Sequence, residues 1–515
     1  MGIEVKIPEF IFLKAFAPAI REVVLYKELE TASPSPFTDT VYLIGYSAKI
    51  EPLLAWAREK KGRALVIIEK RFSVLLDIEE EGLTEPFLEE NIHFRFYREE
   101  IPLEDFAFAL VREFFGKIEI FNLQEDPLFF EEIRRTLLRK GALTDAIYTE
   151  MLRYHQLFAN LIANFRKLPE AFALDGWQGS FKNTLCVICG AGPSLSEARE
   201  LLKREDDLLI FAGGSTISAL NAIHITPHLL FAVDPNPEEF SRLAFHTSQG
   251  VPLVIAPRVE PRVTSGHIGP IGFFPTGTGG AIEAFFLERL GIKDPKILEH
   301  LGEEALSVTC IALMTAIYLG CNPIIFAGVD LSFTDGRRYA SGVFAEDVIQ
   351  EPLLEEEGKK TLIRWIMERD TIEEVIKNHP DTTFYLATEG GLTFKGAGRL
   401  PADSPLVQNP RDLRGEIYDK VFASPLSVTK EAVEGVLLEL QESFLLAKEI
   451  LGKMLLALEK EDTMASTLLF MDLEETLAFR VALKTSLFAL EQRLSCKKEV
   501  YKQLKEIGEA FLSCF

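Results

Sequence analysis

A series of short, unbroken apolar runs constrains the fold of this chain more than any other feature. The first and clearest run is Leu185 to Cys189, and helix-like segments separate it from those that follow. The further runs lie at 208–212, 229–233, 252–256, 323–327 and 383–387. Strands that are apolar on both faces belong to parallel sheets covered by helices on both sides. The runs therefore predict an α/β fold with a Rossmann-like, parallel-sheet central domain.

The regions on either side of this core have different patterns. Before it, apolar runs at 41–45 and 64–69 flank an amphipathic stretch, which predicts a smaller α/β domain whose layout resembles a second copy of the 185–212 unit. After it, 400–427 is rich in Pro, Asp, Arg and Asn and is interpreted as a linker. From Val428 onward, apolar residues recur every three or four positions without proline, which predicts an all-α helical domain. The expected domains are 1–165, 166–425 and 426–515.

Composition excludes several classes of partner. The 515 residues carry a net charge of -23, which argues against a broad surface for nucleic acid or anionic membrane because both require clustered Lys and Arg. A local basic pocket for a small anion is compatible with this negative net charge. No segment is long and uncharged enough to span a bilayer, and residues 1–6 lack an apolar signal core, so a cytoplasmic location is expected.

The six cysteines stand mostly in apolar runs. Cys186 and Cys189 form a C-x-x-C motif inside one predicted strand, with no second Cys or His pair to complete a zinc site. Buried thiols are the favoured interpretation.

The turn Gly190-Ala191-Gly192-Pro193-Ser194 follows the first core strand. Two glycines allow close backbone approach, proline suits a first helical turn, and Ser194 has capping-box spacing to Glu197. Free amides at such a helix start attract phosphate, so we expect an anion site here; a tight connection without a ligand is an equal alternative. Leu195 replaces the third glycine of the dinucleotide fingerprint, and no P-loop lysine follows.

Small and acidic residues also follow the next strands. Gly214 and Ser215 end one strand, Asp234 and Asn236 end another, and Asp330 follows a later one. Parallel strands bring such ends to one edge, so these residues are expected to line one site. Helix capping is the alternative for Asp234. Because position 236 is Asn, an Asp-x-Asp metal pair is absent, which leaves a divalent metal requirement undecided.

These motifs resemble a known family when they are taken in order. The segments "GAGPSL", "ISALNAIHITPHLLFAVDPNP", "SVTCIALMTAIYLGCNPIIFAGVDLSFTDGRRYASG" and "ATEGG", over about 180–400, resemble the Maf (motility-associated factor) glycosyltransferases. Their central domain is similar to bacterial sialyltransferases that use CMP-sialic acid. A related branch resembles 6-hydroxymethylpterin diphosphokinases. The resemblance implies transfer of a nonulosonic, sialic-acid-like sugar from a CMP-activated donor to Ser or Thr of a protein such as flagellin.

The resemblance also implies residue roles. The expected nucleotide-binding residues are Gly190, Ala191, Gly192, Pro193, Ser194, Gly214, Ser215, Asp234, Asn236, Ser307 and Thr309. For Ser307 and Thr309, which begin a predicted helix, ordinary helix capping is an equal alternative. Tyr339 occupies the position from which related sialyltransferases offer a hydroxyl to the leaving phosphate.

The proton acceptor is less clear from the sequence. Related sialyltransferases use a histidine after the tyrosine loop, and this chain has none from 337 to 378. His267, Asp330, Asp335 and Asp234 are the substitutes considered, with a solvated loop as the alternative for His267. Arg337 and Arg338 could supply charge for the phosphate, and solvated surface positions are the alternative for both.

The expected partners are a nucleotide-sugar donor and a protein acceptor, with no cofactor required. The leucine-rich C-terminal helices could also pair between chains as a homo-oligomer. Two other functions stay open: a pterin diphosphokinase-like enzyme that uses ATP and Mg²⁺, and a catalytically silent nucleotide-binding or assembly protein.

Overall fold

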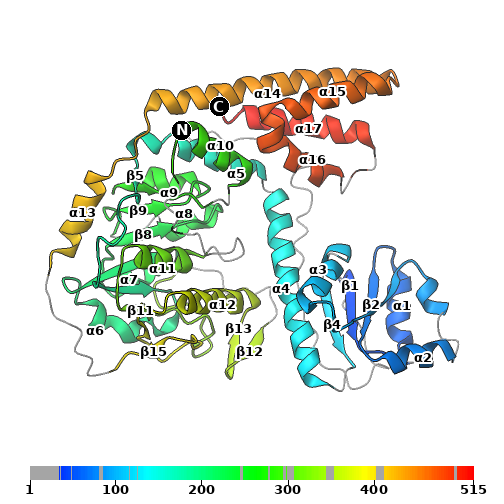
Figure 1. The fold of residues 1–515 in the computed structure, drawn as a ribbon, viewed down its shortest axis with the longest axis horizontal. Helices are drawn as coiled ribbons and strands as arrows, with labels where there is room; N and C mark the ends of the chain where they lie inside the picture. The colour runs from blue at the N-terminus through cyan, green and yellow to red at the C-terminus, as the bar shows by residue number, and fades with distance from the viewer. Residues whose placement is uncertain are drawn as a thin grey trace.

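Three structural regions make up the molecule (Figure 1). The structure is a computed structural model, and it describes residues 34, 36, 38–47, 49–80, 85–114, 116, 118–123, 126–152, 154–243, 248–276, 279–293, 297, 307–343, 353–401, 411–491, 494 and 496–515. The predictions made for residues 1–6 lie outside the described residues. Among the described residues, no helix is long and apolar enough to cross a membrane.

A nine-stranded sheet forms the central region, and every pair of neighbouring strands in it is parallel. Its order is β15-β14-β11-β6-β7-β8-β9-β10-β5. The strands are β5 (Phe172–Ala173), β6 (Leu185–Cys189), β7 (Leu208–Gly213), β8 (Leu229–Ala232), β9 (Leu253–Ile255), β10 (Ile271–Phe273), β11 (Ile324–Ala327), β14 (Phe384–Leu386) and β15 (Gly398–Arg399). The parallel α/β prediction is confirmed, and all six predicted apolar runs of this region contain strands. The three strands that the sequence did not predict have only two or three residues.

The strand order places a topological switch point beside β6. Strands β7 to β10 follow β6 in sequence toward one edge, whereas β11 lies on the other side of β6, with Val187 aligned to Ile325. Connections therefore leave the carboxyl ends of β6 and β11 in opposite directions. Ligands of such sheets bind in the crevice that this reversal opens.

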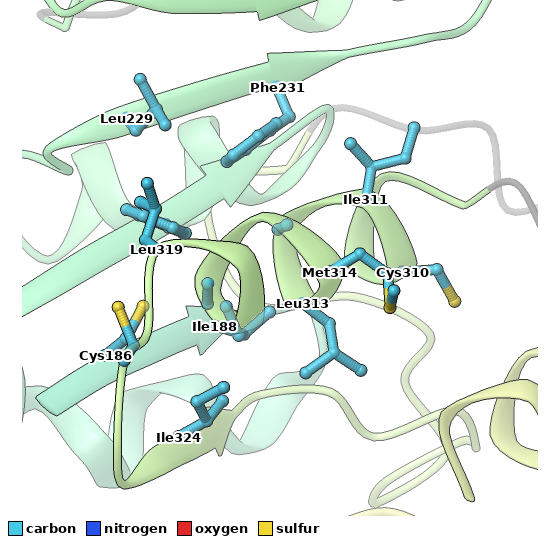
Figure 2. Close-up of a cluster of buried hydrophobic side chains, with 14 of the residues drawn as sticks. Cys186, Ile188, Leu229, Phe231, Cys310, Ile311, Leu313, Met314, Leu319 and Ile324 are labelled. Atoms are coloured by element: carbon cyan, nitrogen blue, oxygen red, sulfur yellow. The ribbon is translucent and has the colours of Figure 1, made fainter. Parts of the chain in front are cut away.

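Helices cover both faces of the sheet. On one face, α11 (Val308–Tyr318) packs its apolar side chains against β6, β7 and β8, as Figure 2 shows for Ile311, Met314 and Phe231. The remaining helices of this region are η4 (Pro193–Ala198), α6 (Arg199–Leu202), α7 (Thr216–Ala222), α8 (Pro237–Leu243), α9 (Pro261–Gly266), α10 (Gly280–Leu290) and α12 (Ile363–Asn378), with a hairpin of β12 (Leu354–Glu356) and β13 (Lys359–Thr361).

The two thiols of the C-x-x-C motif lie on opposite faces of β6. Cys186 belongs to the apolar cluster under α11, whereas Cys189 belongs to the cluster on the other face. Burial raises the pKa of both thiols. The interpretation of this pair as buried thiols is confirmed.

The first region contains a four-stranded parallel sheet of order β3-β2-β1-β4. Its elements are β1 (Thr40–Ile44), α1 (Glu51–Glu59), β2 (Ala64–Glu69), α2 (Phe72–Glu80), η2 (Glu85–Leu88), β3 (Ile92–Phe96), α3 (Leu103–Glu113) and β4 (Ile118–Asn122). The first strand again lies beside a switch point, since β1 pairs with both β2 and β4. The two sheets therefore share the layout that the sequence suggested.

Long helices connect the regions. Helix α4 (Pro127–Leu152) packs on α3 and α12, and α5 (Tyr154–Phe165) packs with the C-terminal helices. The C-terminal helices are α14 (Lys430–Glu459), α15 (Thr463–Glu475), η6 (Phe479–Leu483), α16 (Lys484–Glu491) and α17 (Lys497–Leu512). The short helix η3 (Leu168–Glu170), from earlier in the chain, contacts α14. The all-α prediction for this region is confirmed.

The linker interpretation of 400–427 was wrong over residues 413–423, which form a helix. Helix α13 (Leu413–Ala423) begins at Asp412, whose carboxylate accepts a hydrogen bond from the Gly415 amide. Leu413, Ile417 and Val421 share one face and are buried in the core of the central region. The helical spacing was present in the sequence but was obscured by polar residues on the other faces.

His228 provides a test of this core. It is buried, its Nδ1 accepts a hydrogen bond from the Ile210 amide, and burial, with nearby Arg414, lowers its pKa to about 3. In the unfolded chain, His228 binds a proton below its ordinary pKa of about 6.5, whereas in the folded protein it stays neutral down to a pH of about 3. The contribution of neutral His228 to folding stability is therefore complete above pH 6.5 and is lost as pH falls toward 3. In urea unfolding at several pH values, His228→Asn should show a weaker acid loss of stability than the wild type, by up to a few kcal/mol. Equal pH dependence would contradict this assignment.

Candidate functional site

The Gly190 turn packs tightly against the loop that follows β11. The amides of Gly190 and Gly192 donate to the carbonyls of Ala327 and Gly328. A Cβ atom at Gly190 would collide with the Gly328 backbone. The close backbone approach that the glycines predicted is therefore real, but its partner is another part of the chain.

The Asp330 carboxylate occupies the position expected for a bound anion. It is 2% exposed and accepts hydrogen bonds from the Ser194 amide (3.1 Å), the Ser194 hydroxyl and the Thr334 hydroxyl (2.9 Å). The Ser194 hydroxyl also lies 2.9 Å from the Thr388 hydroxyl. A buried, ionised carboxylate must be satisfied in this way. Asp330 is thus a structural residue in this geometry, and we do not retain it as the base.

The segment after Gly192 also differs from the predicted helix start. It forms the six-residue 3₁₀ helix η4 without a side-chain cap. The predicted capping box is absent, because Ser194 bonds to Asp330 and Glu197 accepts from the Glu389 amide instead. The amide of Ser194 is therefore engaged, and so short a helix offers little dipole for phosphate.

The separated loops nevertheless converge at the carboxyl edge of the sheet. The Ala340 amide donates to the Ala191 carbonyl, which joins the loop after β11 to the Gly190 turn. Gly342 lies against α7, which follows Gly214 and Ser215. Ser218 on α7 in turn donates to the Arg242 carbonyl on α8. The expectation that these segments meet agrees with the geometry.

A polar cluster follows β8, and we call Asp234, Asn236, Glu239 and Arg242 the β8 cluster. Asp234 Oδ1 accepts from the Asn236 amide (2.9 Å) and side chain (2.7 Å). Arg242 Nη1 lies 3.2 Å from Asp234 Oδ2 and 3.3 Å from Glu239 Oε2. Asp234 thus stabilises its own loop and holds an arginine near the sheet edge; its hydrogen bonds go to Asn236, which precedes α8, and not to an amide of the helix.

Glu239 is the most perturbed acid of the β8 cluster. Its side chain is 1% exposed, and among the described residues its Oε1 has no hydrogen-bond partner. Its carboxylate is the nearest group to the space above Gly214. Burial, together with the Asp234 charge, raises the pKa of Glu239 to about 7, although Arg242 opposes the shift.

The loop after β11 presents Tyr339 toward this cluster. Burial lowers the pKa of the Arg242 guanidinium, but the charges of Glu239 and Asp234 raise it by more. The Tyr339 phenol lies near enough to Arg242 to add to this increase. Arg338 stacks over the Tyr339 ring at 4.8 Å, so it is not the freely solvated arginine that was expected. Asp335 and Gly336, both with positive φ, form an exposed two-residue turn between Thr334 and Arg337.

Ser307 and Thr309 begin α11 beside the end of β7, where the Val308 side chain contacts Gly213. Ser307 caps the helix by accepting from the Cys310 amide (3.1 Å). Burial raises the pKa of the Glu368 carboxyl, and hydrogen bonds from the hydroxyls of Ser307 and Thr309 lower it by less. A carboxyl group, and not a phosphate, is their partner here, which favours the capping alternative.

His267 lies at the wrong edge of the sheet for the predicted base. It ends α9, and its Nε2 is 2.7 Å from the carbonyl of Val251, just before β9 begins. In a parallel sheet, the start of β9 is opposite the carboxyl edge where Gly190 and Asp234 lie. Burial lowers the pKa of His267. The histidine is therefore structural, and the proposal of a catalytic role is withdrawn.

Sequence reasoning missed Glu239, Arg242 and Glu368. A signal for the first two was present, since an acid and a base three positions apart follow directly on the Asp-Pro-Asn-Pro loop. Glu368 lies about sixty residues from Ser307, and no local pattern connects them. No group of three or more potential metal ligands occurs among the described residues.

Comparison with known proteins places the central region in context. Residues 159–336 match the family described as 6-hydroxymethylpterin diphosphokinase MptE-like, which agrees with the relation to these enzymes suggested by the motifs. The structure is also similar to that of the MAf glycosyltransferase from Magnetospirillum magneticum AMB-1, with 15% identity, a TM-score of 0.49, and coverage of 93% of this chain and 78% of that chain. Likeness at this level does not decide a substrate or a reaction. No curated protein matches the chain.

The tight contact at Gly190 predicts a specific mutational effect. Gly190→Ala should destabilise the fold by about 1–3 kcal/mol or more, because the new methyl group meets backbone that cannot rotate away. Gly250→Ala is the matched control: open space surrounds that position, so the change should stay within about 0.5 kcal/mol. Urea unfolding measures both, and equal effects would disprove the close packing at the turn.

Proposed function

We propose that this protein is a transferase that moves a nonulosonic sugar from a CMP-activated donor to a hydroxyl group of an acceptor protein such as flagellin. The observation that carries the proposal is the convergence of the loops after β6, β7, β8 and β11 at a switch point of a parallel sheet. This is where α/β enzymes bind nucleotides. The ordered motifs of these same loops support the sugar donor.

The geometry shifts the expected nucleotide position. With the Ser194 amide held by Asp330, the remaining polar groups lie on the β7 and β8 side: Gly214, Ser215, Asn236 and the β8 cluster. We therefore propose that the nucleotide lies over β7 and β8, with its phosphate toward Tyr339.

The proposed transfer requires a group that stabilises the leaving phosphate and a base that deprotonates the acceptor hydroxyl. As the bond between the anomeric carbon and the phosphate oxygen breaks, the Tyr339 hydroxyl donates to the leaving phosphate and stabilises its charge. The acceptor hydroxyl must lose a proton as it forms the new bond. Asp335, an exposed carboxylate on the same loop as Tyr339, is the remaining candidate for that role, since Asp330, His267 and Asp234 are engaged elsewhere.

A second function is favoured by the family match over 159–336, whose description names a pterin diphosphokinase. Such an enzyme would place ATP in the same loops and would require Mg²⁺. A silent nucleotide-binding protein would use the site without turnover.

The leucine-rich C-terminal helices support the proposal of pairing between chains. Large apolar side chains on α14 and α15 are exposed: Leu438, Leu445, Leu446, Leu456, Leu468 and Met471. Burying such a face would stabilise a dimer.

Ligand specificity separates the candidate functions. CMP and a CMP-nonulosonic sugar should raise the thermal unfolding midpoint of the full-length protein, because a ligand that binds only the folded state stabilises it by mass action. Asn236→Ala should reduce this shift. A shift with ATP, Mg²⁺ and a hydroxymethylpterin, but with no cytidine nucleotide, would replace the first function by the second.

Tyr339→Phe tests the leaving-group role. Removing the hydroxyl should lower kcat for sugar transfer, or for donor hydrolysis, by about 10²-fold while KM changes little, because the lost hydrogen bond acts mainly in the transition state. Steady-state release of CMP measures both constants. Tyr385→Phe, a partly buried tyrosine of β14, is the control. An unchanged kcat in Tyr339→Phe would remove the residue from the mechanism.

A further inference from the structure

Arg242 occupies a position that neither the motifs nor the comparisons assign. Its guanidinium lies between Asp234 and Glu239, its carbonyl is held by Ser218, and Tyr339 is nearby. Its side chain is 32% exposed and pairs with Asp234, which follows β8 at the carboxyl edge of the sheet. In a chain of net charge -23, a partly exposed arginine where four loops converge is well placed to attract an anion.

Glu239 competes with any such anion. Its Oε2 pairs with Arg242, whereas its Oε1 is buried beside Gly214 and has no hydrogen-bond partner among the described residues. With Glu239 ionised, Asp234, Glu239 and Arg242 together carry a net charge of -1; with Glu239 protonated, they carry none, and Asp234 still pairs with Arg242. Protonation of Glu239 therefore removes a charge that repels an incoming anion. The state of one buried acid thus sets the charge that an incoming anion meets.

We propose that Arg242 is the residue that binds the phosphate group of the ligand, and that Glu239 controls this binding by accepting or releasing a proton. The inference rests on the proposed function only in that a phosphate-bearing ligand enters over β7 and β8. Because the pKa of Glu239 is about 7, the switch operates near neutral pH. Raising the pH ionises Glu239 and weakens anion binding; lowering it strengthens binding.

Few other titratable groups face Glu239. Helix α7 carries no charged side chain, and α5 reaches the loop through neutral amides of Gln156 and Asn160 that donate to the Pro235 carbonyl. On α9, Arg262 pairs with Glu260 and lies over the Phe240 ring. Among the described residues, the charged or titratable groups of the surrounding elements are Asp234, Glu238, Arg242, Arg258, Glu260, Arg262, Tyr339 and, on α5, Tyr154 and His155. Only Asp234 and Arg242 affect the pKa of Glu239.

Inorganic sulfate is a suitable probe because its charge is constant between about pH 6 and pH 8. In isothermal titration of the full-length protein, the sulfate affinity should fall about fivefold over this interval. Arg242→Ala should weaken binding at pH 6 about tenfold or more, and Arg242→Lys should restore part of it. Glu239→Gln should bind at pH 8 as tightly as the wild type binds at pH 6 and should lose the pH dependence.

Matched controls separate these effects from general charge. Arg262→Ala removes a neighbouring arginine that is also paired with a glutamate, and Glu238→Gln removes the exposed acid next to Glu239; both should bind sulfate like the wild type. Thermal unfolding shows whether each variant is folded. If Arg242→Ala is unfolded, Glu239→Gln decides, because the proposal requires it to strengthen binding at pH 8.

The outcomes also separate this inference from the proposed function. Undiminished sulfate binding in folded Arg242→Ala, or unchanged pH dependence in Glu239→Gln, would overturn the inference. Repeating the titrations with CMP and with ATP extends the test: sulfate binding that follows the prediction without binding of either nucleotide would leave the inference standing and reject the proposed function. Nucleotide binding that is insensitive to Arg242 would do the reverse.

Discussion

The buried Asp330 carboxylate is the constraint on which the carboxyl edge of the central sheet depends. A buried carboxylate must be satisfied by hydrogen bonds, and this one is satisfied by Ser194 from the turn after β6 and by Thr334 from its own loop. Thr388, from the loop after β14, bonds to Ser194 in turn. Satisfying that one charge therefore fixes the turn after β6 against the loops after β11 and β14. Gly391, whose Cβ position would overlap the Asp330 backbone, leaves the room that this arrangement needs.

The hydrogen bonds to Asp330 affect where the proposed anionic ligand would meet positively charged groups. The amides of Gly190, Gly192 and Ser194 after β6 are already paired, and we propose that attraction comes from the side chains and loops that follow β7 and β8. There the acidic residues Asp234 and Glu239 surround a single arginine. Such a cluster is close to electrically balanced, because protonation of Glu239 changes its net charge from -1 to zero. A site of this kind responds to pH far more than a ring of backbone amides does, because amides do not titrate.

The sequence contained the fold more completely than the site. Apolar runs such as Leu185 to Cys189 identify strands because burial on both faces leaves no other residue type acceptable, and parallel order then follows from the intervening helices. The turn chemistry at Gly190 was ambiguous for a physical reason: amides satisfied by a phosphate and amides satisfied by a carboxylate 136 residues away need the same local residues. His267 was misplaced because β10 was not among the predicted strands; its place just before this strand puts it at the amino edge of the parallel sheet.

The smaller sheet also has a buried carboxylate that accepts a hydrogen bond from a backbone amide at its switch point. At the switch point beside β1, the amide of Tyr46 donates to Glu69, a fully buried acid at the end of β2 that also pairs with Arg71. Each sheet thus has an internal carboxylate that accepts from a backbone amide following its first strand, although the acid comes from β2 in one and from the loop after β11 in the other. Two different sources for the same contact indicate that the exposed amides, and not a shared acidic residue, are what the common layout provides. In the central sheet the carboxylate comes from the β11 side, and we propose that a ligand approaches from the β7 and β8 side, where the Arg242 side chain is partly exposed.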